Sequence, residues 1–166
     1  MNNADRLLQV VIAEAKALNI PVSCRIEPNV VINSRAKTRF GCCIKKGDNY
    51  IIELSDKLID APEASCRQTL AHEILHTCRG CRNHGGRWKQ YAGKMNAAYG
   101  YQISRTQTHE ALGIANTIPV RYVLVCQNCG AEIKRARMSK LVRNPERYRC
   151  KCGGMLSVSR YAPEMN

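Results

Sequence analysis

The chain has 166 residues, 45% of them hydrophobic, which allows one compact domain and a small appendix. Its net charge is +13, from 26 Lys and Arg against 13 Asp and Glu. This excess favours a polyanionic partner such as nucleic acid, with an anionic membrane surface and simple solubility as the alternatives. No apolar stretch approaches the ~20 residues of a spanning helix, so we expect no membrane partner.

The amino-terminal stretch MNNADRLLQVVIAEAKAL carries Asp5 and Glu14 among its apolar residues and lacks the basic start of a secretory signal. We therefore expect a cytoplasmic protein, associated with the nucleoid in a prokaryote or nuclear in a eukaryote. In that reducing setting, the ten cysteines are expected to be metal ligands or buried thiols rather than disulfides.

The first elements follow from hydrophobic periodicity. Apolar residues recur at helical spacing over residues 3–18, which predicts an amphipathic helix packed on the core. The runs PVSCRI (21–26), FGCCI (40–44) and YIIEL (50–54) predict short strands, with a turn at KGDN (46–49).

Two more helices are predicted in the middle of the chain. Pro62 suits the first turn of a helix over residues 63–77. Trp88 belongs to an apolar stripe that predicts another helix over residues 86–98, with this stripe in the core.

The composition of the sequence changes between residues 113 and 119, where a strand-like run precedes a cysteine-rich tail. We therefore divide the chain into a first domain over residues 1–116 and a second over residues 117–166. Helices and strands in this mixture predict an α+β fold.

The stretch HEILHTCRGCRNHG (72–85) holds three of the four histidines. His72 and His76 differ by about 40° on a helix and by roughly 6 Å in height. Both imidazoles can therefore bind one ion at about 2.0 Å from the same helix face. Glu73 is rotated by about 60° from His76, so it can accept a proton from water beside the ion. This is the HExxH arrangement of zinc peptidases.

Two helical ligands leave a zinc ion incompletely coordinated, and His84 is the candidate for the third. Seven residues separate it from His76, enough for the chain to turn at Gly80 and return. A fourth position would then stay open for water. Two alternatives remain: a helix whose histidines are satisfied by core hydrogen bonds, and a metal site without catalysis.

Cys78 and Cys81 lie inside this stretch as a Cys-x-x-Cys pair. We expect thiols that do not bind the metal; ligation of the same ion, a disulfide over the turn, and redox control are the alternatives. His109 lies in a polar segment and is expected at the surface. The candidate oxyanion donors are Tyr91, Tyr99 and Arg87.

Four cysteines in the tail form two close pairs, Cys126 with Cys129 and Cys150 with Cys152. Twenty residues separate the pairs, a spacing typical of a four-thiolate zinc ribbon. A tail of about 50 residues buries too little apolar surface to fold alone. Structural zinc, at roughly 10–16 kcal/mol, would supply the deficit.

Residues 130–166 carry a net charge of +6. Arg and Lys at this density contact phosphates in a salt-dependent manner, and Tyr148 and Tyr161 can stack on unpaired bases. This pattern favours sequence-nonspecific binding of DNA, with a solvated basic loop around a structural zinc as the alternative. The basic residues are Lys134, Arg135, Arg137, Lys140, Arg143, Arg147, Arg149, Lys151 and Arg160.

The order of motifs resembles the SprT-like metalloproteases, whose eukaryotic members include Spartan. A strand ending IELS precedes a helix ending TLAHEILH, then a turn, then HGGRWKQYAGKMNAAYGYQISR. In that family the HExxH helix is followed by a His-Gly pair and an aromatic residue, which His84, Gly85 and Trp88 match. RFG (39–41) also resembles the family's basic-glycine strand. The resemblance covers roughly residues 1–115.

The resemblance implies a zincin-like domain followed by a zinc ribbon. By this likeness, His72, His76 and His84 would bind catalytic zinc, Glu73 would be the general base, and the second zinc would be structural. The implied activity is hydrolysis of peptide bonds in DNA-associated proteins, including DNA–protein crosslinks, in DNA repair. The rivals are a non-catalytic zinc-containing nucleic-acid-binding adaptor and a peptidase with no link to nucleic acid.

Overall fold

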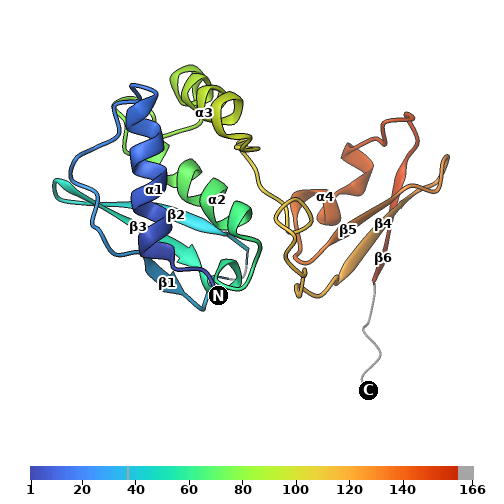
Figure 1. The fold of residues 1–166 in the computed structure, drawn as a ribbon. Helices are drawn as coiled ribbons and strands as arrows, with labels where there is room; N and C mark the ends of the chain where they lie inside the picture. The colour runs from blue at the N-terminus through green and yellow to red at the C-terminus, as the bar shows by residue number, and fades with distance from the viewer. Residues whose placement is uncertain (37, 161–166) are drawn as a thin grey trace. The chain divides into compact units, whose positions relative to one another are not determined.

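The computed structural model describes residues 1–36 and 38–160. The chain divides into two compact units, Met1–Asn116 and Thr117–Asn166, called here the first and second units (Figure 1). Each unit combines helices with a three-stranded sheet, so the mixed α+β fold is confirmed.

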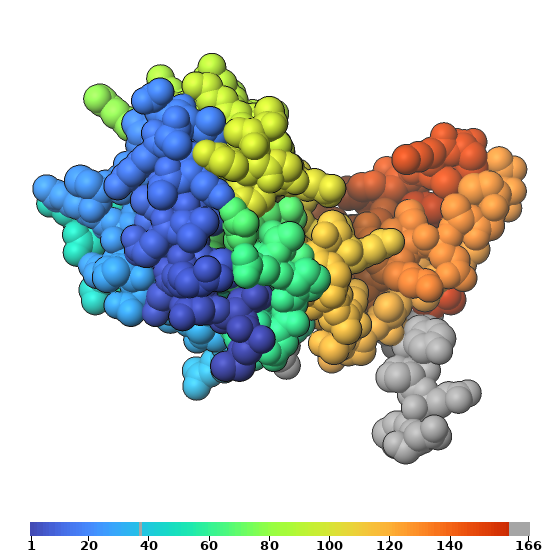
Figure 2. Space-filling model, viewed as in Figure 1, coloured from blue at the N-terminus to red at the C-terminus, as the bar shows by residue number. Residues whose placement is uncertain are grey.

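The first unit begins with α1 (Ala4–Ala17), close to the bounds expected from periodicity. The Asn3 side chain caps it by accepting the backbone N–H of Arg6 at 3.0 Å. Its apolar stripe, which includes Leu7, Leu8 and Val11, is buried. Figure 2 shows the opposite face of α1 spread across the front of this unit.

The sheet of the first unit has the order β1-β3-β2. Strand β1 (Val31–Asn33) runs parallel to β3 (Asn49–Ser55), and β2 (Gly41–Lys46) runs antiparallel to it. The register places Gly41 opposite Leu54. Strand β2 therefore lies at one edge of the sheet, and one of its sides is not paired to another strand within residues 1–36 and 38–160.

A short 3-10 helix, η1 (Asp56–Leu58), connects the sheet to α2 (Glu63–Leu75), and α3 (Gly86–Tyr99) follows. Helix α2 packs against α1, α3, β2 and β3, and it lies at the centre of the unit in Figure 1. Most of its residues are buried, on every side of the helix. Helix α2 is therefore the central element to which the other parts of the unit are attached.

The prediction of a strand over residues 21–26 is wrong. This segment forms only an isolated bridge, between Ile26 and Tyr50. Pro21 has no N–H, and the N–H of Ser23 donates to the Thr77 hydroxyl at 3.1 Å rather than to a strand. The strand parallel to β3 is instead β1, which periodicity did not predict because it has three residues.

The expectation that His109 lies at the surface is also wrong. Its ring is half-buried and meets Phe40 edge to face, with centroids 4.7 Å apart. The polar segment that carries it folds back on α2. The Ser65 hydroxyl donates to the carbonyl of the fully buried Leu112 at 2.9 Å, and the Thr69 hydroxyl donates to Gln107 Oε1 at 3.2 Å.

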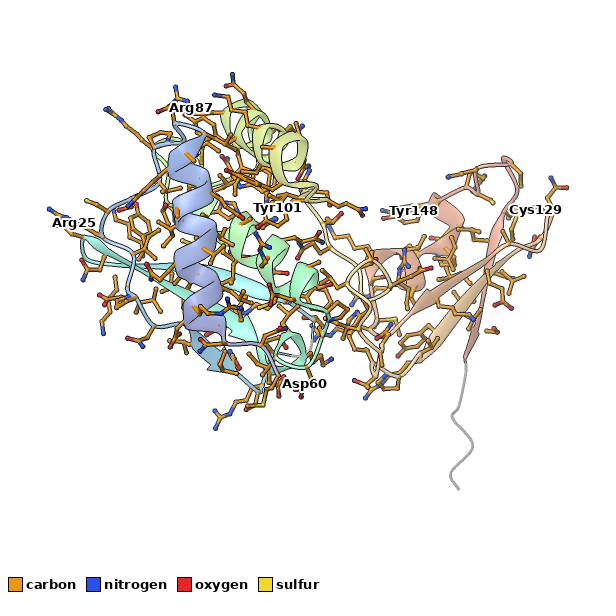
Figure 3. All side chains as sticks on the ribbon, in the orientation of Figure 1. Arg25, Asp60, Arg87, Tyr101, Cys129 and Tyr148 are labelled. Carbon is orange, nitrogen blue, oxygen red and sulfur yellow. The ribbon has the colours of Figure 1, made fainter. Side chains whose placement is uncertain are left out.

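A polar network fastens α1 and α2 to the segment after α3. Arg67 forms an ion pair with Glu14, and its Nε donates to the Tyr101 hydroxyl at 3.2 Å. That hydroxyl donates in turn to Glu14 at 2.5 Å. Figure 3 labels Tyr101. All three side chains are partly buried, so the network favours one arrangement of these elements.

The second unit is an antiparallel sheet with the order β5-β4-β6. Its strands are β4 (Tyr122–Cys126), β5 (Glu132–Arg135) and β6 (Leu156–Arg160), joined through α4 (Lys140–Arg143) and the 3-10 helix η2 (Pro145–Arg147). Among the residues described for this unit, the buried core is small. It consists of Leu124, Cys126, Val142 and Leu156.

Every helix in residues 1–36 and 38–160 is too short or too polar to span a lipid bilayer. Tyr161, proposed above to stack on bases, lies outside the described residues.

We expect Leu8→Ala to lower the free energy of unfolding of the first unit by about 3 kcal/mol, because Leu8 is fully buried in the core. Urea denaturation followed by the fluorescence of Trp88, the single tryptophan, reports on this unit. Gln9→Ala, an exposed position in the same helix, should change the stability by less than about 0.5 kcal/mol. Equal losses for both variants would contradict the packing of α1 described here.

Candidate functional site

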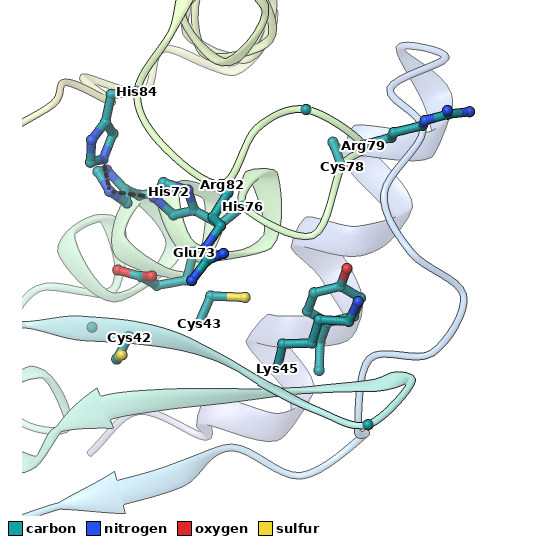
Figure 4. A pocket seen from close by; sticks show the side chains of 14 residues that line it. Cys42, Cys43, Lys45, His72, Glu73, His76, Cys78, Arg79, Arg82 and His84 are labelled. Carbon is teal, nitrogen blue, oxygen red and sulfur yellow. Dashed lines mark hydrogen bonds between the residues drawn. The ribbon is translucent and has the colours of Figure 1, made fainter.

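Three histidine side chains converge at the end of α2 (Figure 4). His72 lies in its last turn, His76 is its C-cap residue, and His84 lies two residues before α3. The Nε2 atom of His72 lies 3.4 Å from Nε2 of His76 and 2.9 Å from Nε2 of His84. Tetrahedral zinc with bonds of 2.0–2.1 Å separates its nitrogen ligands by about 3.4 Å, so the three imidazoles fit zinc.

Backbone carbonyls orient two of these rings. Nδ1 of His72 lies 3.1 Å from the Ser104 carbonyl oxygen, and Nδ1 of His76 lies 2.7 Å from that of Cys81. A carbonyl can only accept, so each Nδ1 carries the proton and each Nε2 keeps a free lone pair. Burial, with His76 and His84 adding to it, lowers the pKa of His72 to about 4, which favours the neutral ring that binds metal.

Trp88 of α3 forms the apolar support behind the histidines. Its ring centroid lies 4.8 Å from that of His72, 5.7 Å from His76 and 4.5 Å from His84. The side chain is 1% exposed. Trp88, Ala92 and Met95 of the predicted apolar stripe are buried, whereas Ala98 at its end is exposed. The tryptophan also contacts the candidate metal site.

Glu73 lies beside the histidines and is itself buried. The backbone N–H of Cys43 in β2 donates to its carboxylate, and Arg39 is close enough to favour its charged form. Burial outweighs both effects and raises the pKa of Glu73 to about 7. A carboxylate with this pKa can both accept and release a proton near neutral pH.

Gly41 in β2 makes room for Glu73. A Cβ atom at this position would lie 2.7 Å from Glu73 Oε1 and 2.8 Å from its Cγ. Glycine is therefore required where the edge strand passes under α2. The RFG motif (39–41) indicated that a glycine occurs in this strand. Periodicity alone could not show that the Glu73 side chain approaches it.

The histidines and Glu73 lie in an open cleft of about 970 Å³. Strand β2 and the turn around Gly80 also line it, so the cleft extends from the histidines along the unpaired edge of the sheet (Figure 4). A site with three ligands, a buried carboxylate and open access is arranged as catalytic zinc sites are, whereas structural sites are closed by four protein ligands.

The family model for the SprT-like family matches residues 18–109 of the chain. The chain belongs to the SprT-like family. No curated protein matches it. The matched region of this SprT-like chain contains β1, β2, β3, α2 and α3, with all three histidines and Glu73.

The other sequence candidates in this SprT-like domain lie outside the histidine group. Cys78 and Cys81 are buried and form no disulfide, and burial raises the pKa of the Cys78 thiol to about 12. Two of the candidate oxyanion donors are engaged elsewhere: the Tyr99 hydroxyl donates to the Glu14 carbonyl, and Arg87 donates to that of Arg79. These two and Tyr91 are not among the cleft-lining residues described.

Sequence reasoning missed the groups that orient the histidines. The carbonyls of Ser104 and Cys81 and the N–H of Cys43 belong to the backbone, which every residue has. No residue type signals them, because their role depends only on where the chain passes.

The four tail cysteines gather in the second unit as a second candidate metal site. Cys126 Sγ lies 3.5 Å from Cys152 Sγ, and Cys129 Sγ lies 3.6 Å from Cys150 Sγ. Sulfur ligands at 2.3 Å from tetrahedral zinc are about 3.8 Å apart, so this group also fits zinc. Figure 3 shows Cys129 at one end of the sheet.

Backbone N–H groups favour the thiolate form of two of these cysteines, whereas at Cys129 the N–H of Ala131 is outweighed by hydrogen bonds with the other cysteines, which raise the pKa of Cys129 to about 12. The N–H of Gly154, followed by the other cysteines, lowers the pKa of Cys152 to about 6. The N–H groups of Cys129 and Asn128 lower that of Cys126. A Cβ atom at Gly154 would lie 2.6 Å from Cys126 Sγ, so the second turn needs glycine there to close around the site.

We expect purified protein to contain about two zinc ions per chain, one for each candidate site. His84→Ala should reduce the content to one, as should the double variant Cys150→Ser with Cys152→Ser. Mass spectrometry of the metal, after gel filtration, measures both. His109→Ala alters the one histidine outside the group and should keep two zinc ions. Two zinc ions in His84→Ala would contradict the assignment of the third ligand.

Proposed function

We propose that the chain is a zinc metallopeptidase. The observation that carries this proposal is the convergence of three Nε2 atoms next to a buried carboxylate, inside an open cleft. An adaptor with two structural metals would need neither the open cleft nor Glu73 at this position.

His72, His76 and His84 would hold the zinc. Zinc bound by three imidazoles is a Lewis acid that polarises a carbonyl group and makes water acidic near neutral pH. Glu73 accepts a proton from the attacking water and then delivers it to the nitrogen of the departing amine. The Cys43 N–H and the space at Gly41 keep the carboxylate in place during both transfers.

The unpaired edge of β2 would bind the substrate in an extended conformation. The N–H of Ser55 donates to the carbonyl of Phe40 at 2.8 Å, which fixes the alternation of hydrogen bonds along the strand. Gly41, Cys43 and Lys45 consequently turn their backbone groups away from β3. The Cys43 N–H already donates to Glu73. The other backbone N–H and carbonyl groups of these three residues can form hydrogen bonds with a peptide that lies along the cleft.

We further propose that the substrates are proteins bound to DNA, including DNA–protein crosslinks, as the family resemblance implies. The second unit supports this, because eight of the basic side chains named above are exposed and only Lys134 forms an ion pair within the described residues. Tyr148 is 40% exposed and available for stacking on an unpaired base. The ribbon would hold the peptidase near its substrates without reading base sequence.

We expect Glu73→Gln to lower the rate of peptide hydrolysis by at least about 10²-fold, because glutamine cannot accept the proton. The assay is cleavage of the protein itself, of casein and of a DNA-bound protein, each with and without DNA. Zinc content and melting temperature should match those of the unmodified protein. If the unmodified protein cuts none of these substrates, the adaptor function replaces the peptidase.

We expect the ribbon to dominate DNA binding. Replacing Arg137, Arg143 and Arg147 with alanine should weaken binding. The plot of log affinity against log salt should also become less steep, by about 0.7 to 0.9 in the magnitude of its slope for each phosphate that the variant no longer binds. Fluorescence anisotropy with labelled single- and double-stranded oligonucleotides measures both quantities.

The matched control replaces three exposed lysines of the first unit, Lys16, Lys89 and Lys94, with alanine. It removes the same charge and should leave the affinity within about threefold, since these lysines do not belong to the ribbon. Equal losses in both triple variants would mean that net charge, rather than the ribbon, determines binding.

A further inference from the structure

The cleft that contains the histidines is strongly basic. Lys45, Arg79 and Arg82 line it and are exposed. Glu73 is the only carboxylate among the described residues that line the cleft, and it is buried against β2. A substrate entering the cleft therefore meets three positive charges and no exposed negative one.

None of these three cations forms an ion pair within the described parts of the chain. The acids nearest in sequence to β2 are already paired: Asp48 binds Arg25 at 2.6 Å, and Glu53 binds Arg39. The Lys45 ammonium group lies 6.0 Å from the centroid of the Tyr50 ring, a contact that leaves its positive charge unneutralised. Such charges on the walls of a cleft attract anionic groups more strongly than they would on a flat surface.

The basic residues lie where the side chains of a bound peptide would pass. A Cβ at Gly41 would point at Glu73, so the alternating side chains of β2 place Lys45 on the same face of the sheet as the cleft. Lys45 lies four positions after Gly41 along the strand, a distance of about 13 Å at ~3.3 Å per residue. Arg79 and Arg82 flank Gly80 in the turn that lines the cleft with β2 (Figure 4).

We propose that the cleft selects substrates with Asp or Glu within about four residues of the scissile bond. This inference rests on the proposed peptidase function and adds its substrate class. A peptide fits the cleft better than a nucleic acid does. The β2 edge presents backbone hydrogen-bonding groups, and Tyr50, beside Lys45, is the one aromatic residue other than histidine among the described cleft-lining residues. Single strands of nucleic acid bind through several stacking platforms.

The first experiment uses the unmodified zinc-loaded protein and three long peptides. The parent peptide is neutral and contains one known cleavage site. The second peptide carries two Glu within four residues of that site. The third peptide carries the two Glu about 33 Å from the site, measured along an extended chain at ~3.3 Å per residue. We expect kcat/KM to be about five- to tenfold higher for the second peptide, as for two exposed ion pairs. The third should stay within twofold of the parent, and 1 M salt should remove the difference, because the Debye length is then about 3 Å.

The second experiment reverses the cleft charges with Lys45→Glu, Arg79→Glu and Arg82→Glu together. The ratio of kcat/KM between the acidic and neutral peptides should fall below one. The control, Lys16→Glu with Lys89→Glu and Lys94→Glu, changes the net charge equally outside the cleft and should preserve the ratio. Zinc content and melting temperature are measured for both variants.

Four outcomes would overturn the proposal. Equal rates for all three peptides, or equal effects of near and distant Glu, would remove the acidic preference alone and leave the peptidase intact. Loss of DNA affinity with an unchanged peptide ratio in the cleft variant would make the cleft a groove for nucleic acid. Failure to cleave even the parent peptide would remove the peptidase function, and this proposal with it.

Discussion

The close packing of α2 on the edge strand β2 is the constraint on which the rest of the site depends. At Gly41 the two elements approach so closely that no Cβ fits next to the Glu73 carboxylate. That approach buries Glu73 against the Cys43 N–H, and it fixes the face of α2 that carries His72. One contact between a helix and a strand thus places Glu73, the first two candidate metal ligands and the unpaired strand edge in one cleft.

The turn after α2 completes the site through its backbone. The Cys81 carbonyl orients His76, and the same turn brings the chain back so that His84 reaches His72. Trp88 then supports all three rings from α3. Because the candidate ligands come from both ends of one turn, this short segment sets the geometry of the histidine group. Cys78 and Cys81 of this turn are buried and belong to the hydrophobic core of the first unit.

The sequence predicted those parts of the site that depend on spacing. The spacing of four positions from His72 to His76 implies a shared helix face, and the two cysteine pairs imply a ribbon. It did not predict the parts of the site that depend on which segments the tertiary fold brings next to the histidines. The half-buried position of His109 follows from the return of its polar segment over α2, and the Ser104 carbonyl belongs to a residue that carries no signal for its role. Residues 21–26 had a strand-like composition, but they make only one isolated bridge to β3, and the N–H of Ser23 donates to the Thr77 hydroxyl instead of to a strand.

Under the two proposals, the two basic surfaces of the chain bind different partners, DNA at the ribbon and acidic peptide segments at the cleft. The ribbon residues face solvent around a small core, where they can contact phosphates without regard to sequence. The cleft residues flank a strand edge, where they would meet peptide side chains. A protein bound to DNA directs its basic surface toward the phosphates, so its acidic segments remain exposed. A cleft that prefers acidic segments would therefore cut the parts of a bound protein that the DNA leaves uncovered.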